Sequence, residues 1–161
     1  SPFIFYEPGF NLRPTEINAF LGINQLKKME WLRKKRFTNH KLYKKLLGNH
    51  VQSQEFDKDS FVCSIHFCAL AHDSAERKAI VKELAKNGIE TRLFTAGNLG
   101  RHPFWYSYHK KFSAPNSDRL YECGFFLPNN TSLSDKDIKY ISSVVLNTVK
   151  KHRDNLNLNN A

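Results

Sequence analysis

The sequence has 161 residues, of which 40% are hydrophobic and 25% are charged, and this length suits one globular domain with its own core. No apolar run approaches the ~20 residues that cross a bilayer, and no basic and apolar leader follows Ser1. Three cysteines do not make a disulfide framework, so we expect a cytoplasmic protein. The formal net charge of +10 indicates either solvated basic helices or an anionic partner, such as nucleic acid, a membrane surface or a phosphorylated small molecule.

The first half of the chain is predicted to be extended over residues 1–13 and then helical from Pro14 to about Leu47, with Gly48-Asn49 as the stop. Apolar residues fall on every side of the start of this helix, namely Ile17, Phe20, Leu21, Ile23, Leu26, Met29 and Leu32. A surface helix has a single apolar stripe, so we expect this helix to be buried by several neighbours. Those neighbours indicate a missing domain or a second subunit.

The second half alternates short strands with helices. We predict a loop over 49–59, a strand over 60–70, a helix over 75–87, a strand over 89–94, an irregular segment over 95–117, a short helix over 118–123, a strand over 124–127, a helix over 135–152 and a frayed tail. This order predicts an α+β fold with helices packed on a small sheet. Cys63, His66 and Cys68 lie in the first strand, where alternation separates Cys63 from the other two, so we expect core packing and no metal site.

Candidate catalytic residues do not form a recognisable set. The sequence has no Gly-rich phosphate loop, HExxH, GxSxG or paired CxxC motif, and its seven histidines are scattered. One stretch that stands out is Asn11-Leu12-Arg13, directly before the Pro14 helix. An amide, a guanidinium and a helix N-terminus together suit a phosphate. Equally, Arg13 could flank the helix cap while Asn11 closes a turn.

The second stretch runs from Thr91 to Trp105 and contains two glycines, an asparagine, a histidine and two arginines. Glycines allow a ligand to approach the backbone closely, and the aromatic residues after them could stack on a base or sugar. The alternative is a long surface loop that Phe104 and Trp105 hold down. Long loops of this kind are often functional, which favours a ligand site.

Three motifs in this chain resemble the DegT/DnrJ/EryC1/StrS family of pyridoxal-phosphate-dependent enzymes that act on nucleotide-linked sugars. They are GFNLRPTEINAFLGINQLKKM (9–29), KNGIETRLFTAGNLGRHPFW (86–105) and GFFLPNNTSLSDKDIKYI (124–141). The second motif is most similar to the branch of nucleotide-sugar 3-dehydratases and some C-4 aminotransferases. The resemblance implies the small C-terminal domain of a fold-type-I aminotransferase, with a mainly antiparallel sheet. It also implies an interdomain segment and long helix over 1–48 and a small domain over 49–161.

The resemblance also implies site residues. Asn11 would reach the phosphate of pyridoxal 5'-phosphate in the other subunit of a homodimer, and Arg13 would help to hold phosphate or the sugar nucleotide nearby. The expected substrate-binding residues, which would face a nucleotide-diphosphate sugar, are Arg92, Asn98, Arg101, His102, Asn129 and Asn130.

One departure from the family is length, because its members are more than twice as long. The residue that meets the cofactor, a lysine in aminotransferases and a histidine in 3-dehydratases, lies upstream of the segment that matches Ser1. We therefore expect this chain alone to lack catalysis and to need its own large domain. The implied function is amino transfer to, or 3-dehydration of, a nucleotide-linked keto-deoxysugar in polysaccharide or lipopolysaccharide sugar biosynthesis, with no nucleic-acid or membrane partner. The alternatives are a basic nucleic-acid-binding domain and a non-catalytic dimerisation module.

Overall fold

The computed structural model describes residues 4, 6, 9, 15–94 and 97–159. Its elements are α1 (Glu16–Leu26), α2 (Met29–Leu47), β1 (Gln52–Ser53), β2 (His66–Leu70), α3 (Ser74–Lys86), β3 (Arg92–Leu93), the 3₁₀ helix η1 (Leu99–Arg101), α4 (Pro103–Tyr106), α5 (Pro115–Cys123), β4 (Gly124–Pro128) and α6 (Asp135–Asn159). The strands form one sheet in the order β1-β2-β4-β3, and every neighbouring pair is antiparallel. The predicted α+β class with an antiparallel sheet is confirmed.

The two central strands have one buried face and one more open face. Burial alternates along β2, where Phe67 and Ala69 are buried and their sequence neighbours are less so. In β4, Phe125 and Leu127 are buried and Phe126 between them is less so. Side chains of a strand point alternately to the two sides of a sheet, and only one side here is covered by the main helices. His66 and Phe126 are partly exposed, as expected for the other side.

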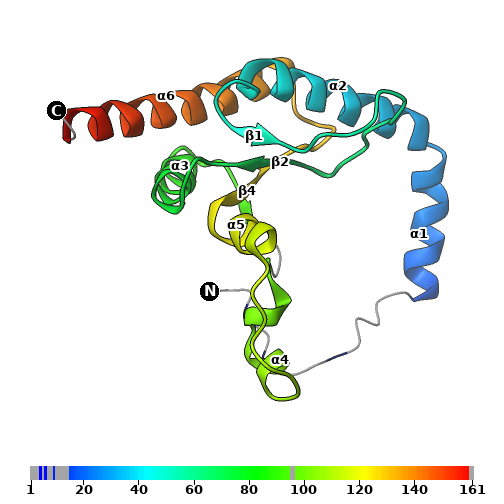
Figure 1. The fold of residues 1–161 in the computed structure, drawn as a ribbon. Helices are drawn as coiled ribbons and strands as arrows, with labels where there is room; N and C mark the ends of the chain where they lie inside the picture. Colours follow the sequence, from blue (N-terminus) through cyan, green and yellow to red (C-terminus); the bar gives the residue numbers. More distant parts are fainter. Residues whose placement is uncertain (1–3, 5, 7–8, 10–14, 95–96, 160–161) are drawn as a thin grey trace.

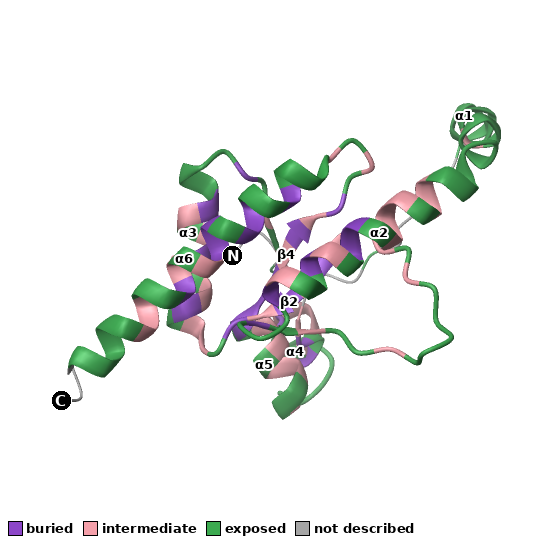
Figure 2. Ribbon diagram, turned by 90° about the horizontal axis from the view of Figure 1, so that it is seen from above, coloured by how far each residue is buried: buried purple, intermediate pink, exposed green. Residues whose placement is uncertain are grey.

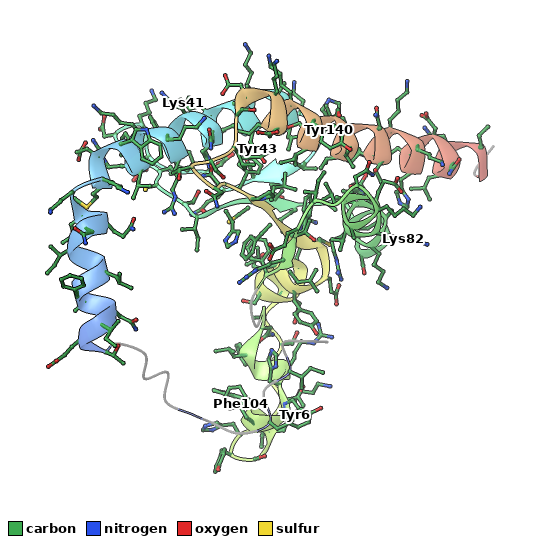
Figure 3. The ribbon with its side chains drawn as sticks, turned by 180° about the vertical axis from the view of Figure 1, so that it is seen from behind. Tyr6, Lys41, Tyr43, Lys82, Phe104 and Tyr140 are labelled. Carbon is green, nitrogen blue, oxygen red and sulfur yellow. The ribbon has the colours of Figure 1, made fainter. Side chains whose placement is uncertain are left out.

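Helices α2, α3 and α6 cover the buried face of the sheet (Figure 1). Their buried side chains join those of the strands in one cluster, in which Tyr43 of α2 stacks on Phe67 with ring centroids 5.0 Å apart. In Figure 3, Tyr43 points toward the sheet, whereas Lys41 on the same helix points outward. The Tyr43 hydroxyl donates to the Pro128 carbonyl across 2.9 Å, which joins α2 to the end of β4. The second half of α2 is therefore part of the core.

The predicted helix over 14–47 is wrong in one respect, because it is two helices. Lys28 has φ −100° and ψ 0°, outside the helical range, and its N–H donates to the Gln25 carbonyl, three residues back, across 2.9 Å. The chain therefore turns between α1 and α2, and α1 stands apart from the rest of the fold (Figures 1 and 2). No residue of α1 is buried within the described structure.

Other boundaries also differ from the sequence predictions. The strand expected over 60–70 begins only at His66, so Cys63 is exposed and does not pack in the core. The segment expected to be irregular contains η1, α4 and the start of α5, since Pro103 and Pro115 each occupy the first turn of a helix. The last helix extends to Asn159 through residues expected to fray.

Two predicted helix starts are confirmed by their caps. Asp73 Oδ1 accepts from the Glu76 N–H across 2.8 Å at the start of α3. Ser134 and Asp137 cap each other at the start of α6, with the Ser134 N–H donating to Asp137 Oδ2 across 2.7 Å. Among the described helices, none combines the length and the apolar character needed to cross a bilayer.

Candidate functional site

A cleft of about 370 Å³ lies where β2 begins, β3 begins and β4 ends. The strand register explains its composition. His66 pairs with Pro128, and Arg92 pairs with Phe126, so the residues at these strand ends are brought side by side. Asn129 directly follows β4 and also lines the cleft. Sheet pairing therefore assembles one polar site from segments more than 20 residues apart.

Three of the predicted substrate-binding residues meet in this cleft: Arg92, Asn129 and Asn130. Thr91, which opens the second stretch singled out in the sequence, also lines the cleft. Sequence reasoning did not assign the other polar lining residues to a substrate site, namely Arg36, His66 and Glu90. Arg36 stands in a basic helical run and His66 in a strand, so neither has a local motif around it. Only the register and the packing of α2 onto the sheet bring them here.

Asn129 fixes the wall of the cleft. It is 1% exposed, and its Nδ2 donates to the Arg36 carbonyl across 3.2 Å and to the Ser64 carbonyl across 2.8 Å. These two acceptors set the orientation of the amide, because only the nitrogen can donate. Its Oδ1 is buried without a partner among the described residues. Asn129 thereby holds α2 against the segment that enters β2.

Asn130 shapes the turn after β4. Its carbonyl accepts from Asn39 Nδ2 across 3.1 Å, and its Oδ1 accepts from the Ser132 N–H across 3.0 Å. Such a side-chain acceptor two residues back closes a local turn. The two asparagines thus keep the end of β4 in contact with α2.

The cleft is electropositive. Arg92 is paired with Glu90, with 3.7 Å between nitrogen and oxygen, while Arg36 adds a second guanidinium. His66 stacks on Phe126, with ring centroids 5.1 Å apart. Burial lowers the pKa of His66 below its ordinary value, and the positive charges of Arg92 and Arg36 act in the same direction against the effect of Glu90. The lowered pKa favours the neutral imidazole.

Asn98, Arg101 and His102 do not line this cleft. Asn98 is 5% exposed, and its Nδ2 donates to Asp118 Oδ1 across 3.0 Å while its Oδ1 accepts from the Gly100 N–H across 2.9 Å. Arg101 Nη1 donates to Asp118 Oδ1 and to a Glu122 carboxylate oxygen, each across 3.2 Å. In the chain as described, Asn98 and Arg101 fasten the loop after β3 to α5.

His102 lies in a different hollow. It is 3% exposed, and its ring is near those of Phe104 and Tyr121, with centroids 6.3 and 6.5 Å away. Together with Arg101 and Tyr6 it lines a cavity of about 330 Å³. The structure therefore divides the predicted substrate-binding residues between two places.

The glycines of this loop pack against side chains. Gly97 has φ +51°, and a Cβ there would meet the Tyr121 ring, while a Cβ at Gly100 would lie 2.8 Å from Phe112 Cβ. Sequence reasoning assigned these glycines to close approach by a ligand. The structure shows close approach by the chain itself.

The predicted cofactor residues Asn11 and Arg13 lie outside the described residues. The start of the next helix is described: Thr15 Oγ1 accepts from the Asn18 N–H across 3.4 Å and caps α1. In the sequence, residues 11–13 thus come shortly before a helix N-terminus. An amide, a guanidinium and a helix N-terminus form a donor set that fits a phosphate group.

No metal site is evident among residues 15–94 and 97–159, where no group of three or more His, Cys, Asp or Glu gathers in metal-binding geometry.

Comparison with known proteins explains the combination of fold and motifs. The family model described as the DegT/DnrJ/EryC1/StrS aminotransferase family matches residues 3–146. The chain belongs to this family. The resemblance seen in the three sequence motifs is thereby confirmed, and DegT-family membership applies to nearly the whole chain.

Relatives in the DegT family include enzymes of two kinds. A GDP-4-keto-6-deoxy-D-mannose 3-dehydratase of Yersinia pseudotuberculosis is 26% identical over 89% of this chain and 38% of its own length. A GDP-perosamine synthase of Escherichia coli O157:H7 is 29% identical over 83% of this chain and 36% of its own length. The chain therefore spans less than two fifths of the length of these relatives.

A solved structure supports the fold assignment. The E. coli GDP-4-keto-6-deoxy-D-mannose-3-dehydratase, determined with bound hydrated pyridoxal phosphate, matches with a TM-score of 0.70 and 26% identity, over 89% of this chain and 38% of that one. The expectation of an aminotransferase-family fold is confirmed by this similarity.

Proposed function

We propose that this chain is the C-terminal part of a pyridoxal-phosphate-dependent enzyme that modifies a nucleotide-linked keto-deoxysugar in lipopolysaccharide biosynthesis. The observation that carries the proposal is the family match over residues 3–146, in a chain that spans only 38% of a dehydratase relative. A cofactor-anchoring residue would then lie in the remaining part of the longer protein. The reaction is either amino transfer from glutamate to the keto carbon or removal of the 3-hydroxyl.

The proposed role of the cleft is to hold the substrate side of that active site. Arg92 supplies a positive charge, while Asn129 fixes the backbone of α2 at Arg36 and Asn130 fixes the turn after β4. Asn98, Arg101 and His102 remain in the proposal as residues of the adjacent loop. The internal hydrogen bonds of Asn98 and Arg101 and the burial of Asn98 and His102 favour a supporting role, which is to hold the loop rigid beside the substrate.

The proposed cofactor is pyridoxal 5'-phosphate, which supplies an electrophilic aldehyde and an electron-withdrawing ring when bound. The contribution of this chain is at the phosphate. Asn11 would donate an amide N–H and Arg13 a guanidinium to phosphate oxygens, next to the capped start of α1. With the large domain absent, we expect the chain alone to bind the cofactor weakly.

A homodimer is the proposed assembly, in the cytoplasm. Its support is α1, on which Ile17, Phe20, Leu21 and Ile23 are 73, 66, 56 and 58% exposed. An exposed apolar surface of this kind marks an interaction site. The large domain and the second subunit would cover it.

Product analysis tests the proposed reaction. The gene would be expressed with its upstream coding sequence, and the protein incubated with pyridoxal phosphate, glutamate and a nucleotide-linked 4-keto-6-deoxysugar. Mass spectrometry and NMR of the product would show a 4-amino sugar for amino transfer or a 3-deoxy sugar for dehydration. Recovery of unchanged substrate with both the GDP-linked and the dTDP-linked sugar would contradict the proposal.

A further inference from the structure

The polar cleft contains a cation that the fold leaves without a counter-ion among the described residues. Arg36 Nε is buried and has no acceptor in that part of the chain. Arg33 Nε is buried without a partner as well, but Arg33 also contacts the Glu30 carboxylate through Nη2 at 2.9 Å, and Arg101 and Arg153 contact carboxylates at 3.2 and 2.8 Å. A buried donor of a charged group without an acceptor is unfavourable, because it has lost its hydrogen bond to water and forms none within the protein. An anionic ligand in the cleft would supply the missing acceptor.

The charges around the cleft do not balance. Among the described residues that line it, Glu90 is the only acidic one, and it already lies 3.7 Å from Arg92. This leaves Arg36 as an uncompensated charge. Both arginines act on His66, since both lower the pKa of its imidazole. Their fields therefore overlap in one small site.

The walls of the cleft are fixed before any ligand arrives. Asn129 Nδ2 donates to the Arg36 carbonyl, which anchors the backbone of that arginine, and the stacking of His66 on Phe126 positions the imidazole. Hydrogen-bond donors that are already held in place lose less conformational entropy when they bind a ligand. A guanidinium also matches the geometry of a phosphate or carboxylate, because it can donate two parallel hydrogen bonds.

We propose that Arg36 and Arg92 together bind one oxyanion group of a ligand, a phosphate or a carboxylate, with His66 beside them. Arg36 is thereby a binding residue that no sequence motif marks. The inference rests on the proposed function and deepens it, because it adds Arg36 to the cleft assigned to the substrate; its test needs neither the cofactor nor the rest of a longer protein.

The first test follows His66 by NMR in the purified 161-residue chain. Inorganic phosphate and glutamate are added in separate titrations at constant ionic strength. Either anion should shift the His66 imidazole signals and raise the pKa of His66, since a nearby negative charge favours the imidazolium. A response to phosphate identifies a phosphate site, and a response to glutamate alone identifies a carboxylate site. No response to either anion would overturn the inference.

Variants test the assignment to Arg36. Arg36→Met keeps the aliphatic stem and removes the charge, and we expect the dissociation constant to rise about tenfold. Lys34→Met is the matched control, since Lys34 is an exposed residue of the same helix that does not line the cleft, and its effect should stay within about twofold. Equal losses in the two variants would indicate general charge attraction and overturn the proposal.

If circular dichroism shows that Arg36→Met does not fold, Arg36→Lys is used as the test variant. It keeps the charge but not the planar fork, so binding should weaken by about threefold or more. Unchanged binding in a folded Arg36→Lys variant would overturn the proposal. The proposed function fails separately, because it depends on cofactor and product in the longer protein.

Discussion

Arg153 Nε donates to Glu76 Oε1 across 2.8 Å, and this ion pair joins α6 to α3. The Glu76 side chain is fully buried and also accepts from the His72 N–H across 2.7 Å. Arg153 Nη2 donates further to the His50 carbonyl across 2.9 Å. One arginine therefore connects the end of α6 with α3 and with the segment after α2.

The first prediction is that Arg153→Met destabilises the chain. Removing one partner of a buried ion pair costs about 3–5 kcal/mol, but Arg153 is 41% exposed, so we expect a loss of about 2 kcal/mol in the free energy of unfolding. Urea denaturation measures it. Arg77→Met is the control, because Arg77 is also half-buried but its Nε donates to a backbone carbonyl, that of Glu122, and not to a carboxylate. Similar losses in the two variants would contradict the account.

A second prediction concerns His40, which is 4% exposed and packs against the rings of Phe56 and Phe67. Burial, with a smaller effect of Lys44, lowers its pKa below the ordinary 6.5. The unfolded state then binds more protons than the folded state. The contribution of His40 to the free energy of unfolding is therefore fully present above about pH 6.5 and is lost as the pH is lowered through that value.

His40→Leu should therefore flatten the loss of stability between about pH 7.5 and 5, as measured by urea midpoints. The slope should shrink without vanishing, since the pKa of His66 is lowered as well. His109→Leu is the control, because His109 is exposed. An unchanged slope in His40→Leu would refute this explanation.

A third prediction separates backbone strain from steric overlap at two glycines. Gly88 has φ +68° with open space around it, whereas Gly97 has φ +51° and faces the Tyr121 ring. Gly88→Ala should cost about 1 kcal/mol from strain alone. Gly97→Ala should cost about 2 kcal/mol more, because the methyl group overlaps the ring. Thermal denaturation of both variants measures the difference, and equal costs would contradict the packing described.

A fourth prediction concerns Asp118, which accepts from Asn98 Nδ2, Arg101 Nη1 and Ser113 Oγ. The hydrogen bond from Asn98 is the largest of several effects that hold the pKa of Asp118 below its ordinary value. Asp118→Ala should loosen the loop that carries Arg101, and trypsin should cleave there faster than in the unchanged chain. Asp135→Ala, whose carboxylate lies 3.9 Å from Lys35, is the control and should leave cleavage unchanged.

Local signals in the sequence predicted the starts of α3 and α6. Asp73 and Ser134 are caps because their short side chains can reach free N–H groups, and this chemistry is readable without a structure. The turn between α1 and α2 was not predicted, because neither glycine nor proline marks it at Lys27-Lys28. β1 was missed for another reason: its two residues lie in a polar segment and become a strand only by pairing with β2.

The candidate site was predictable only in part. Arg92 and Asn129 were found because they lie in family motifs, but their meeting depends on strand register, which the sequence does not reveal. Arg36 was missed because it is one of several basic residues in a helical run. The roles of Asn98 and Arg101 in holding the loop depend on Asp118, whose proximity arises from tertiary packing.

The division of the chain at residue 48 and the homodimer stay predictions. The net charge also allowed a nucleic-acid-binding domain, but the family match favours the enzyme.

Cofactor capture by the longer protein tests the central claim most directly. The gene would be expressed with its upstream coding sequence, loaded with pyridoxal phosphate, reduced with borohydride and weighed by intact mass spectrometry. The account predicts that the longer protein binds a stoichiometric amount of the cofactor. If a lysine anchors the cofactor, as in an aminotransferase, reduction attaches it covalently. If a histidine takes that place, as in a 3-dehydratase, the cofactor is bound but not attached. A folded longer protein that binds no pyridoxal phosphate would contradict the account.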